Sequence, residues 1–232
     1  MADDDPRSID QDAFFADGEG DRFYERNAEK LGTKGRDPVM HLLEQYGARP
    51  KTVAELGCAD GWRLSLIRES FGARCLGIDA SPEAVRGGME RDPELELVQG
   101  TLAELPWETA TLDVVAFVFV LCWNDRATLL RAFTEADRVL KNGGLMIIGD
   151  FDPDHPVRRP YHHRPDLSVF TYKQDYSQVL LSTNLYRPLA RLSYLTGTEE
   201  ERYRTELPSD TRAFCTLMKK SLTGYYQELP NP

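Results

Sequence analysis

Short apolar runs alternate with amphipathic segments through the middle of the chain. Five of these runs have the length and composition of buried strands, at residues 52–56, 74–79, 95–99, 113–119 and 145–150. The segment 126–140 places its apolar residues at helical spacing, and Ser81-Pro82-Glu83 is typical of a capped helix start. Buried strands that alternate with helices predict a doubly wound α/β fold, in which helices cover both faces of a mostly parallel sheet.

The two ends of the chain show other patterns. Residues 12–46 predict two or three helices, interrupted at Gly18, Gly20, Gly32 and Gly35. We interpret residues 1–47 as a helical lid and residues 48–232 as the main domain. The segment 151–165, crowded with Pro, His and Arg, predicts a loop, and 172–183 predicts a helix. Aromatic and β-branched residues favour strands at 185–196 and 211–219, which would complete a seven-stranded sheet as an antiparallel hairpin.

Composition narrows the classes of partner. The formal net charge of -10 arises from 38 acidic and 28 basic side chains, which disfavours nucleic acid and anionic membranes as partners. The four cysteines fit neither a metal motif nor a disulfide framework, and the acidic start is unlike a signal peptide. No apolar run reaches about 18 residues. We therefore expect a cytoplasmic enzyme, monomeric or homodimeric.

The first strand runs directly into a turn of small residues, Leu56-Gly57-Cys58-Ala59-Asp60-Gly61. Roughly 20 residues later the second strand ends at Asp79, where this kind of fold holds ribose hydroxyls. A dinucleotide enzyme would carry GxGxxG, whereas this chain has Glu55-x-Gly57-x-Ala59-x-Gly61. An acid ahead of the turn repels a diphosphate and suits a cofactor with a cationic amino-acid end.

This segment resembles motif I of the class I S-adenosylmethionine-dependent methyltransferases, with Ala59 in place of the usual middle glycine. The resemblance implies a Rossmann-like domain that binds S-adenosylmethionine and releases S-adenosylhomocysteine. It implies that the turn faces the methionine portion, Asp79 binds the ribose and Ala80 lies beside the adenine. The positions to which we assign cofactor contacts within the domain are Glu55, Gly57, Cys58, Ala59, Gly61, Asp79, Ala80, Thr101, Leu102 and Phe119.

Two of the family's later positions differ in this chain. Thr101 stands where an aspartate usually faces the adenine amino group, so that the adenine contact falls to a hydroxyl or to main-chain groups near Leu102. Cys122 stands where many members carry histidine, either as a buried structural thiol or as a nucleophile. Trp123 either packs in the core or forms part of the acceptor site.

Histidines and arginines gather in the loop after the fifth strand, and ligands of this fold bind at the carboxyl ends of the strands. We therefore interpret residues 151–170 as an active-site insertion that binds an anionic acceptor through phosphate or carboxylate. His162 and His163 are the candidate general bases, because an unperturbed imidazole titrates near neutral pH. The alternative is a solvated, salt-bridged loop. A metal site is not expected, since adjacent histidines rarely share one ion.

A looser resemblance links Tyr24, Arg26, Tyr161 and Tyr172 to bacterial surface-sugar and capsule-associated methyltransferases. It implies that Tyr24 and Arg26 meet the carboxylate of the cofactor or cap the acceptor. The alternative is an ordinary amphipathic helix with its charges in water. The expected acceptor-binding residues are Trp123, Asp152, Arg158, Arg159, Tyr161 and Tyr172. The predicted function is O-methylation of a small anionic metabolite, with nucleotide-linked and sugar-like molecules among the candidates. The alternatives are small-molecule N-methylation and a non-catalytic cofactor-binding scaffold.

Overall fold

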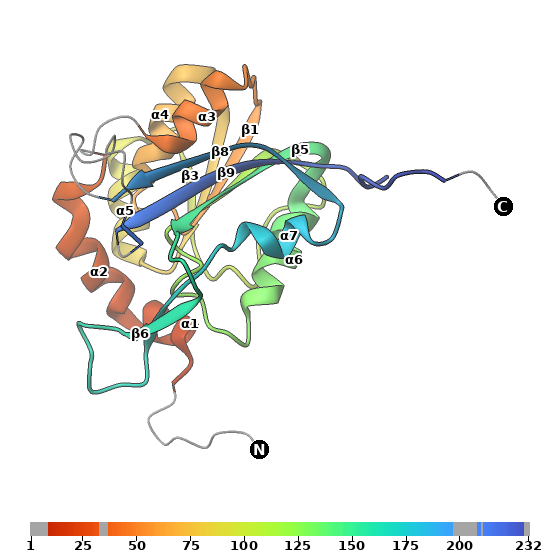
Figure 1. Cartoon of the computed structure of the whole chain (residues 1–232). Helices are drawn as coiled ribbons and strands as arrows, with labels where there is room; N and C mark the ends of the chain where they lie inside the picture. Colours follow the sequence, from red (N-terminus) through yellow and green to blue (C-terminus); the bar gives the residue numbers. More distant parts are fainter. Residues whose placement is uncertain (1–8, 33–36, 197–207, 210, 230–232) are drawn as a thin grey trace.

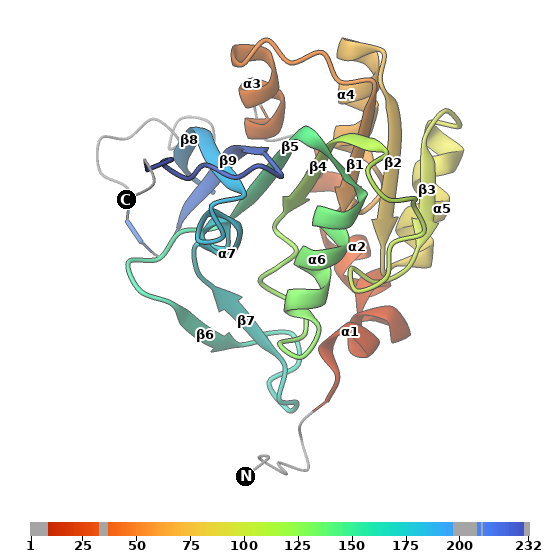
Figure 2. The same ribbon diagram turned by 90° about the vertical axis from the view of Figure 1, so that its right-hand side faces the viewer.

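The computed structural model describes residues 9–32, 37–196, 208–209 and 211–229. Seven strands form one sheet in the order β3-β2-β1-β4-β5-β9-β8. Figure 1 shows the whole chain, and all seven strands are labelled in Figure 2. Their bounds are β1 Thr52–Leu56, β2 Arg74–Asp79, β3 Glu96–Gln99, β4 Leu112–Val118, β5 Leu140–Phe151, β8 Tyr186–Leu195 and β9 Arg212–Lys220. The first five strands are parallel, and β9 runs antiparallel to both β5 and β8. The predicted mostly parallel sheet with a C-terminal antiparallel hairpin is confirmed.

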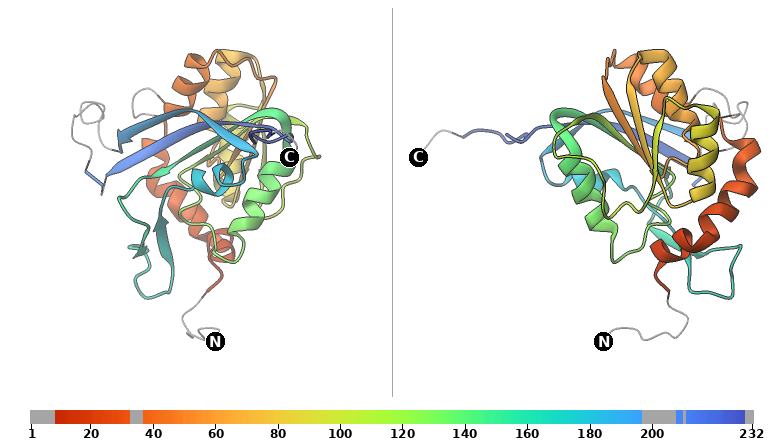
Figure 3. Two further views of the ribbon diagram at one scale, coloured as in Figure 1. Left: turned by 45° about the vertical axis from the view of Figure 1, so that its right-hand side comes forward. Right: turned by 180° about the vertical axis from the view of Figure 1, so that it is seen from behind.

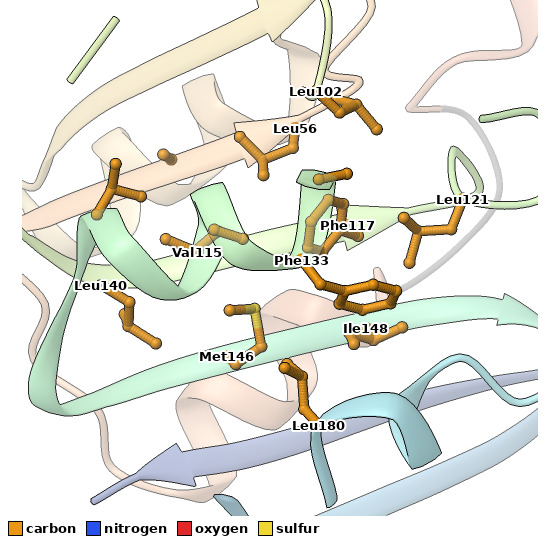
Figure 4. Packing of buried hydrophobic residues seen from close by; sticks show 14 of the residues in the cluster. Leu56, Leu102, Val115, Phe117, Leu121, Phe133, Leu140, Met146, Ile148 and Leu180 are labelled. Atoms are coloured by element: carbon orange, nitrogen blue, oxygen red, sulfur yellow. The ribbon is translucent and has the colours of Figure 1, made fainter. Parts of the chain in front are cut away.

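Helices cover both faces of this sheet (Figure 2). The helices α3 Pro38–Gln45, α4 Trp62–Phe71 and α5 Pro82–Arg91 bury apolar side chains with one set of strand residues, including Val114 and Ala116. The helices α6 Leu129–Val139 and α7 Ser177–Leu181 pack on the other face, where Phe133 and Leu180 lie beside Phe117 and Met146 (Figure 4). Neighbouring residues of a strand point to opposite faces, so each strand supplies both halves of the core.

The N-terminal segment crosses the carboxyl-terminal edge of the sheet. It comprises α1 Gln11–Phe14, a π-helical turn η1 Phe15–Glu19, α2 Gly20–Asn27 and a 3-10 turn η2 Ala28–Lys30. The segment bends at Gly18, whose φ of 113° is favourable only for glycine. Its α2 lies beside α5 (Figure 3), where the Ser81 hydroxyl donates a 2.6 Å hydrogen bond to Asp21.

Two predicted elements differ from the structure. Residues 157–160 of the expected loop form β6 Val157–Pro160, which pairs antiparallel with β7 Phe170–Lys173. The predicted helix 172–183 is therefore wrong in its first part, because Tyr172 is paired with Arg158 in this ladder, and only Ser177–Leu181 is helical. In addition, β5 begins at Leu140, before the predicted start of the fifth strand at residue 145, and Leu140 pairs with Leu112 of β4. Gly35 and residues 1–8 of the expected lid lie outside the described residues.

Within the described ranges, no helix is both long enough and apolar enough to cross a membrane.

Candidate active site

The backbone of the turn after β1 lies close to the loop after β4. Gly57 has a φ of 77°, and a Cβ atom there would lie 2.3 Å from Val120 Cγ2. Ala59 also has a positive φ, 49°, which costs an L-residue about 1–2 kcal/mol. The Ala59 N–H donates a 2.7 Å hydrogen bond to Asp79 Oδ2, and the Ser81 N–H donates a 2.9 Å bond to Asp79 Oδ1. These bonds hold the Asp79 carboxyl at the ends of β1 and β2.

Burial dominates the electrostatics of Asp79. Loss of water raises the pKa of the carboxyl, and the backbone N–H groups of Ser81 and Ala59 oppose this shift because they stabilise the charged form. Each carboxylate oxygen has a second lone pair that can accept a bond from a ligand hydroxyl. Asp79 is therefore positioned to bind a diol at the end of the turn.

Glu55 is a second buried acid, at the end of β1. Only 2% of its surface is exposed, and its Oε1 accepts a charged hydrogen bond from Arg63, which also donates a 2.9 Å bond to Asp37. Its Oε2 is buried and has no hydrogen-bond partner among the described residues. Burial raises the pKa of Glu55 to about 7, against the opposing effect of the Arg63 guanidinium. An ammonium group of a ligand would supply the missing partner.

Two adjoining cavities open beside these acids. The first is lined by Asp12, Phe15, Gly20, Phe23, Tyr24, Gly57, Ala59, Asp79, Ala80, Gly100, Thr101, Leu102, Phe119, Val120, Trp123 and Asn124. The second, of about 430 Å³, is lined by Phe23, Asn27, Lys30, Leu31, Gly32, Asp37, Pro38, Glu55, Gly57, Cys58, Ala59, Trp62, Arg63, Val118, Phe119, Trp123, Phe151, Tyr194 and Thr196. The two share Phe23, Gly57, Ala59, Phe119 and Trp123. An elongated ligand can thus reach from Asp79 to Glu55.

Most of the residues expected to contact the cofactor line these cavities. Those that do are Tyr24, Glu55, Gly57, Cys58, Ala59, Asp79, Ala80, Thr101, Leu102 and Phe119. Gly61 is instead packed near Leu95 and Leu97 of the core. The Arg26 guanidinium donates hydrogen bonds to Glu19 at 2.5 Å and to Tyr161 at 3.0 Å, and it does not line either cavity.

The two candidate histidines lie outside both linings. His162 and His163 are exposed, with ring centroids 3.8 Å apart, and slight burial with nearby positive charge lowers the pKa of His163. Tyr161, in contrast, is 1% exposed, and its hydroxyl donates a 2.9 Å bond to Glu19. The described residues contain no group of three or more His, Cys, Asp or Glu side chains that could hold a metal ion.

The other expected acceptor residues are also dispersed, apart from Trp123, which lines both cavities. Asp152 forms ion pairs with Arg191 at 3.1 Å and Arg212 at 3.2 Å. In the β6–β7 hairpin, the Arg158 guanidinium lies 4.7 Å from the Phe170 ring, and Arg159 is exposed. Tyr172 of β7 packs under the Arg126 guanidinium at 4.3 Å. None of Asp152, Arg158, Arg159, Tyr161 and Tyr172 lines either of the two cavities.

Cys122 is buried beside Asp150. Burial raises the pKa of its thiol well above the usual range, and the Asp150 carboxyl raises it further. A thiol that stays protonated is a poor nucleophile, so the structure favours the structural role for Cys122.

Sequence reasoning missed several residues that line the cavities. Asp12 and Asn124 form part of the first cavity, and Phe151 and Tyr194 form part of the second. Phe23 shows in the sequence only as an apolar position of the N-terminal segment. No local pattern links Asp12 to Asn124, because their contact depends on how the N-terminal segment crosses the sheet.

The sheet order, the turn after β1 and the acid at the end of β2 define a class I S-adenosylmethionine-dependent methyltransferase domain. Residues 54–148 match the family described as "Methyltransferase domain". Residues 54–148 therefore belong to the S-adenosylmethionine-dependent methyltransferase family, as the resemblance implied. The looser resemblance to capsule-associated enzymes stays a prediction.

Relatives of known sequence support this assignment. The chain is similar to the malonyl-[acyl-carrier protein] O-methyltransferase of Nitrosospira multiformis, with 31% identity over 191 residues, 71% of this chain and 61% of that protein. A Mycobacterium tuberculosis protein named "Probable S-adenosylmethionine-dependent methyltransferase" is 33% identical over 123 residues, 49% of this chain and 43% of that protein. The chain thus spans less than two thirds of the length of these relatives.

Solved structures show the same fold. The 1,6-didemethyltoxoflavin-N1-methyltransferase of Burkholderia thailandensis, with bound 1,6-didemethyltoxoflavin and S-adenosylhomocysteine, has a TM-score of 0.69 and 14% identity. The likeness covers 92% of this chain and 91% of that one. At this identity, it is evidence for the fold alone.

Proposed function

We propose that the protein transfers the methyl group of S-adenosylmethionine to a small molecule bound in the second cavity. The fit of the cofactor to this chain rests on two features. The unpartnered Oε2 of Glu55 suits its ammonium group, and the fixed carboxylate of Asp79 suits its ribose hydroxyls. When bound, the cofactor supplies an activated methyl group on a sulfonium, and the protein has to align the acceptor with it.

The walls of the second cavity favour a planar acceptor. Phe23, Phe119, Trp123, Phe151 and Tyr194 all line it. Phe119 and Phe151 are in edge contact at 5.2 Å, and Phe23 and Trp123 at 4.9 Å. A volume of about 430 Å³ falls in the range of small-molecule sites. Rigid aromatic walls bind flat molecules and orient them for an in-line attack.

The composition of the second cavity supports some types of acceptor atom over others. Its described lining contains no histidine, and its two carboxyl groups, Asp37 and Glu55, both bind Arg63. A hydroxyl acceptor requires a base, whereas a ring nitrogen or a carboxylate attacks without one. We therefore favour an acceptor with a free lone pair over a sugar hydroxyl.

Both remaining types have support. The aromatic walls favour a heteroaromatic nitrogen, and the structurally similar Burkholderia enzyme binds 1,6-didemethyltoxoflavin. The expected O-methylation of an anion is supported by Lys30 in the lining and by the name of the Nitrosospira relative. Lys30 then replaces the arginines of the β6–β7 hairpin as the cationic group that meets the acceptor.

A turnover screen with heteroaromatic amines and with carboxylates, read by mass, tests the proposal. Once an acceptor is known, Phe151→Ala should raise its KM severalfold, because Phe151 belongs to the aromatic wall of the second cavity. The affinity for S-adenosylhomocysteine should change much less, because Glu55 and Asp79, which hold the two ends of the cofactor, are unaltered. The matched control is His162→Ala with His163→Ala, which should retain wild-type kcat. A large loss of kcat in this control would restore a histidine base. Binding of S-adenosylhomocysteine without turnover of any acceptor would favour the scaffold.

A further inference from the structure

The lining of the first cavity contains the polar side chains of Asp12 and Asn124 in addition to Asp79. Asp12 of α1 and Asn124 of the loop after β4 line it together with Ala80, Thr101 and Leu102. Asp79 would bind the ribose of the cofactor, and Ala80, Thr101 and Leu102 of the same lining would lie beside its base. Asp12 and Asn124 line the cavity that would hold this base.

The orientation of the Asn124 amide follows from its neighbours. Its Nδ2 donates a 2.8 Å hydrogen bond to Asp12 Oδ1 and a 3.0 Å bond to Thr128 Oγ1. Asp12 can only accept, and the Thr128 hydroxyl already donates its one proton to Asp12 Oδ2. The nitrogen of the amide must therefore face this pair, and the oxygen must face the other way.

The Asn124 Oδ1 atom is consequently an acceptor without a donor. The residue is only 4% exposed, and Oδ1 has no hydrogen-bond partner among the described residues. A buried acceptor that stays unpaired is unfavourable, so a donor on a bound ligand would stabilise this arrangement. The amino group of adenine is a donor on the edge of the base, whereas a carbonyl at the same position is not.

We propose that Asn124 Oδ1 recognises the exocyclic amino group of the adenine of S-adenosylmethionine. Asp12 is a positioning residue in this arrangement, because it holds the amide in the orientation that presents the oxygen. It also accepts a 2.8 Å bond from the Asp125 N–H, and therefore ties α1 to the loop after β4. Recognition of the base is in this way linked to docking of the N-terminal segment.

Calorimetric titration of the full chain with two probes tests the proposal. The probes are S-adenosylhomocysteine and S-inosylhomocysteine, in which a carbonyl replaces the amino group. The wild-type protein should bind the adenosyl compound at least tenfold more tightly, because the carbonyl would face Asn124 Oδ1. Asn124→Leu, which has similar volume and no acceptor, should reduce this preference to below threefold.

Three further variants make the test independent of how well Asn124→Leu folds. Thr101→Val tests the alternative in which the Thr101 hydroxyl contacts the adenine amino group, and on our proposal it keeps the full preference. Asn142→Leu is the matched control, because Asn142 lines neither of the two cavities. Asp12→Asn should weaken the preference, because a neighbouring amide can pair with either end of Asn124. Equal wild-type affinity for both probes, an undiminished preference in a folded Asn124→Leu protein, or loss of preference in Thr101→Val would each overturn the proposal. Failure of S-adenosylhomocysteine to bind at all would instead overturn the cofactor assignment.

Discussion

Replacement of Glu55 by Gln tests the cofactor end of the site most directly. The change removes the charge from a buried side chain and keeps its size. We expect loss of a charged hydrogen bond to the cofactor ammonium, worth about 1.5–3 kcal/mol, which weakens the binding of S-adenosylhomocysteine by roughly 10 to 150 fold. Arg63 keeps its 2.9 Å ion pair with Asp37, so that α4 stays anchored to α3.

The raised pKa of Glu55 adds a pH dependence with a defined sign. With a pKa of about 7, the free protein carries a protonated Glu55 below neutral pH. Binding of an ammonium group requires the ionised form, so affinity should fall as the pH falls. The ionised fraction rises from roughly a tenth at pH 6 to roughly three quarters at pH 7.5, which predicts about an eightfold gain in affinity.

Titration calorimetry from pH 6 to pH 7.5 measures both effects. In buffers of different ionisation enthalpy, the wild-type protein should release protons on binding at pH 6, and Glu55→Gln should release far fewer. Thermal unfolding of the variant reports whether the fold is intact. Wild-type affinity in a folded Glu55→Gln protein, or an unchanged pH dependence in it, would refute the assignment of Glu55 to the ammonium group.

Three further predictions concern the turn and the N-terminal segment. Asp79→Ala should weaken binding of S-adenosylhomocysteine by about 1–3 kcal/mol in calorimetry, since the ribose hydroxyls lose a charged acceptor; full affinity would contradict its role. Ala59→Gly should bind S-adenosylhomocysteine normally, because glycine adopts a φ of 49° without strain. Gly57→Ala should abolish this binding, because the added Cβ would overlap Val120. Equal affinities of the two variants would disprove this geometry. Tyr161→Phe should lower the free energy of unfolding by about 1–3 kcal/mol in urea, because buried Glu19 loses a donor, and an unaltered unfolding curve would argue against this.

Local sequence patterns determined the sheet and the cofactor turn. The period of apolar residues and the capping signals depend on neighbours a few positions apart, so the five parallel strands could be predicted within a few residues at most boundaries. Glu55, Gly57 and Asp79 could be placed for the same reason. They end two adjacent parallel strands, and these ends meet at one edge of any such sheet.

Only the tertiary structure decided which polar residues share a cavity. His162 and His163 follow β6, which pairs antiparallel with β7. The preceding Tyr161 is buried and bonds Glu19, whereas both histidines are exposed. Asp12 and Asn124 are 112 positions apart and meet because α1 crosses the loop after β4. Contacts between distant segments depend on how whole elements pack, and no periodicity along the chain encodes them. The contacts that the N-terminal segment adds to the cavities are therefore a property of the fold, whereas the turn after β1 and the acid after β2 are already present in the sequence.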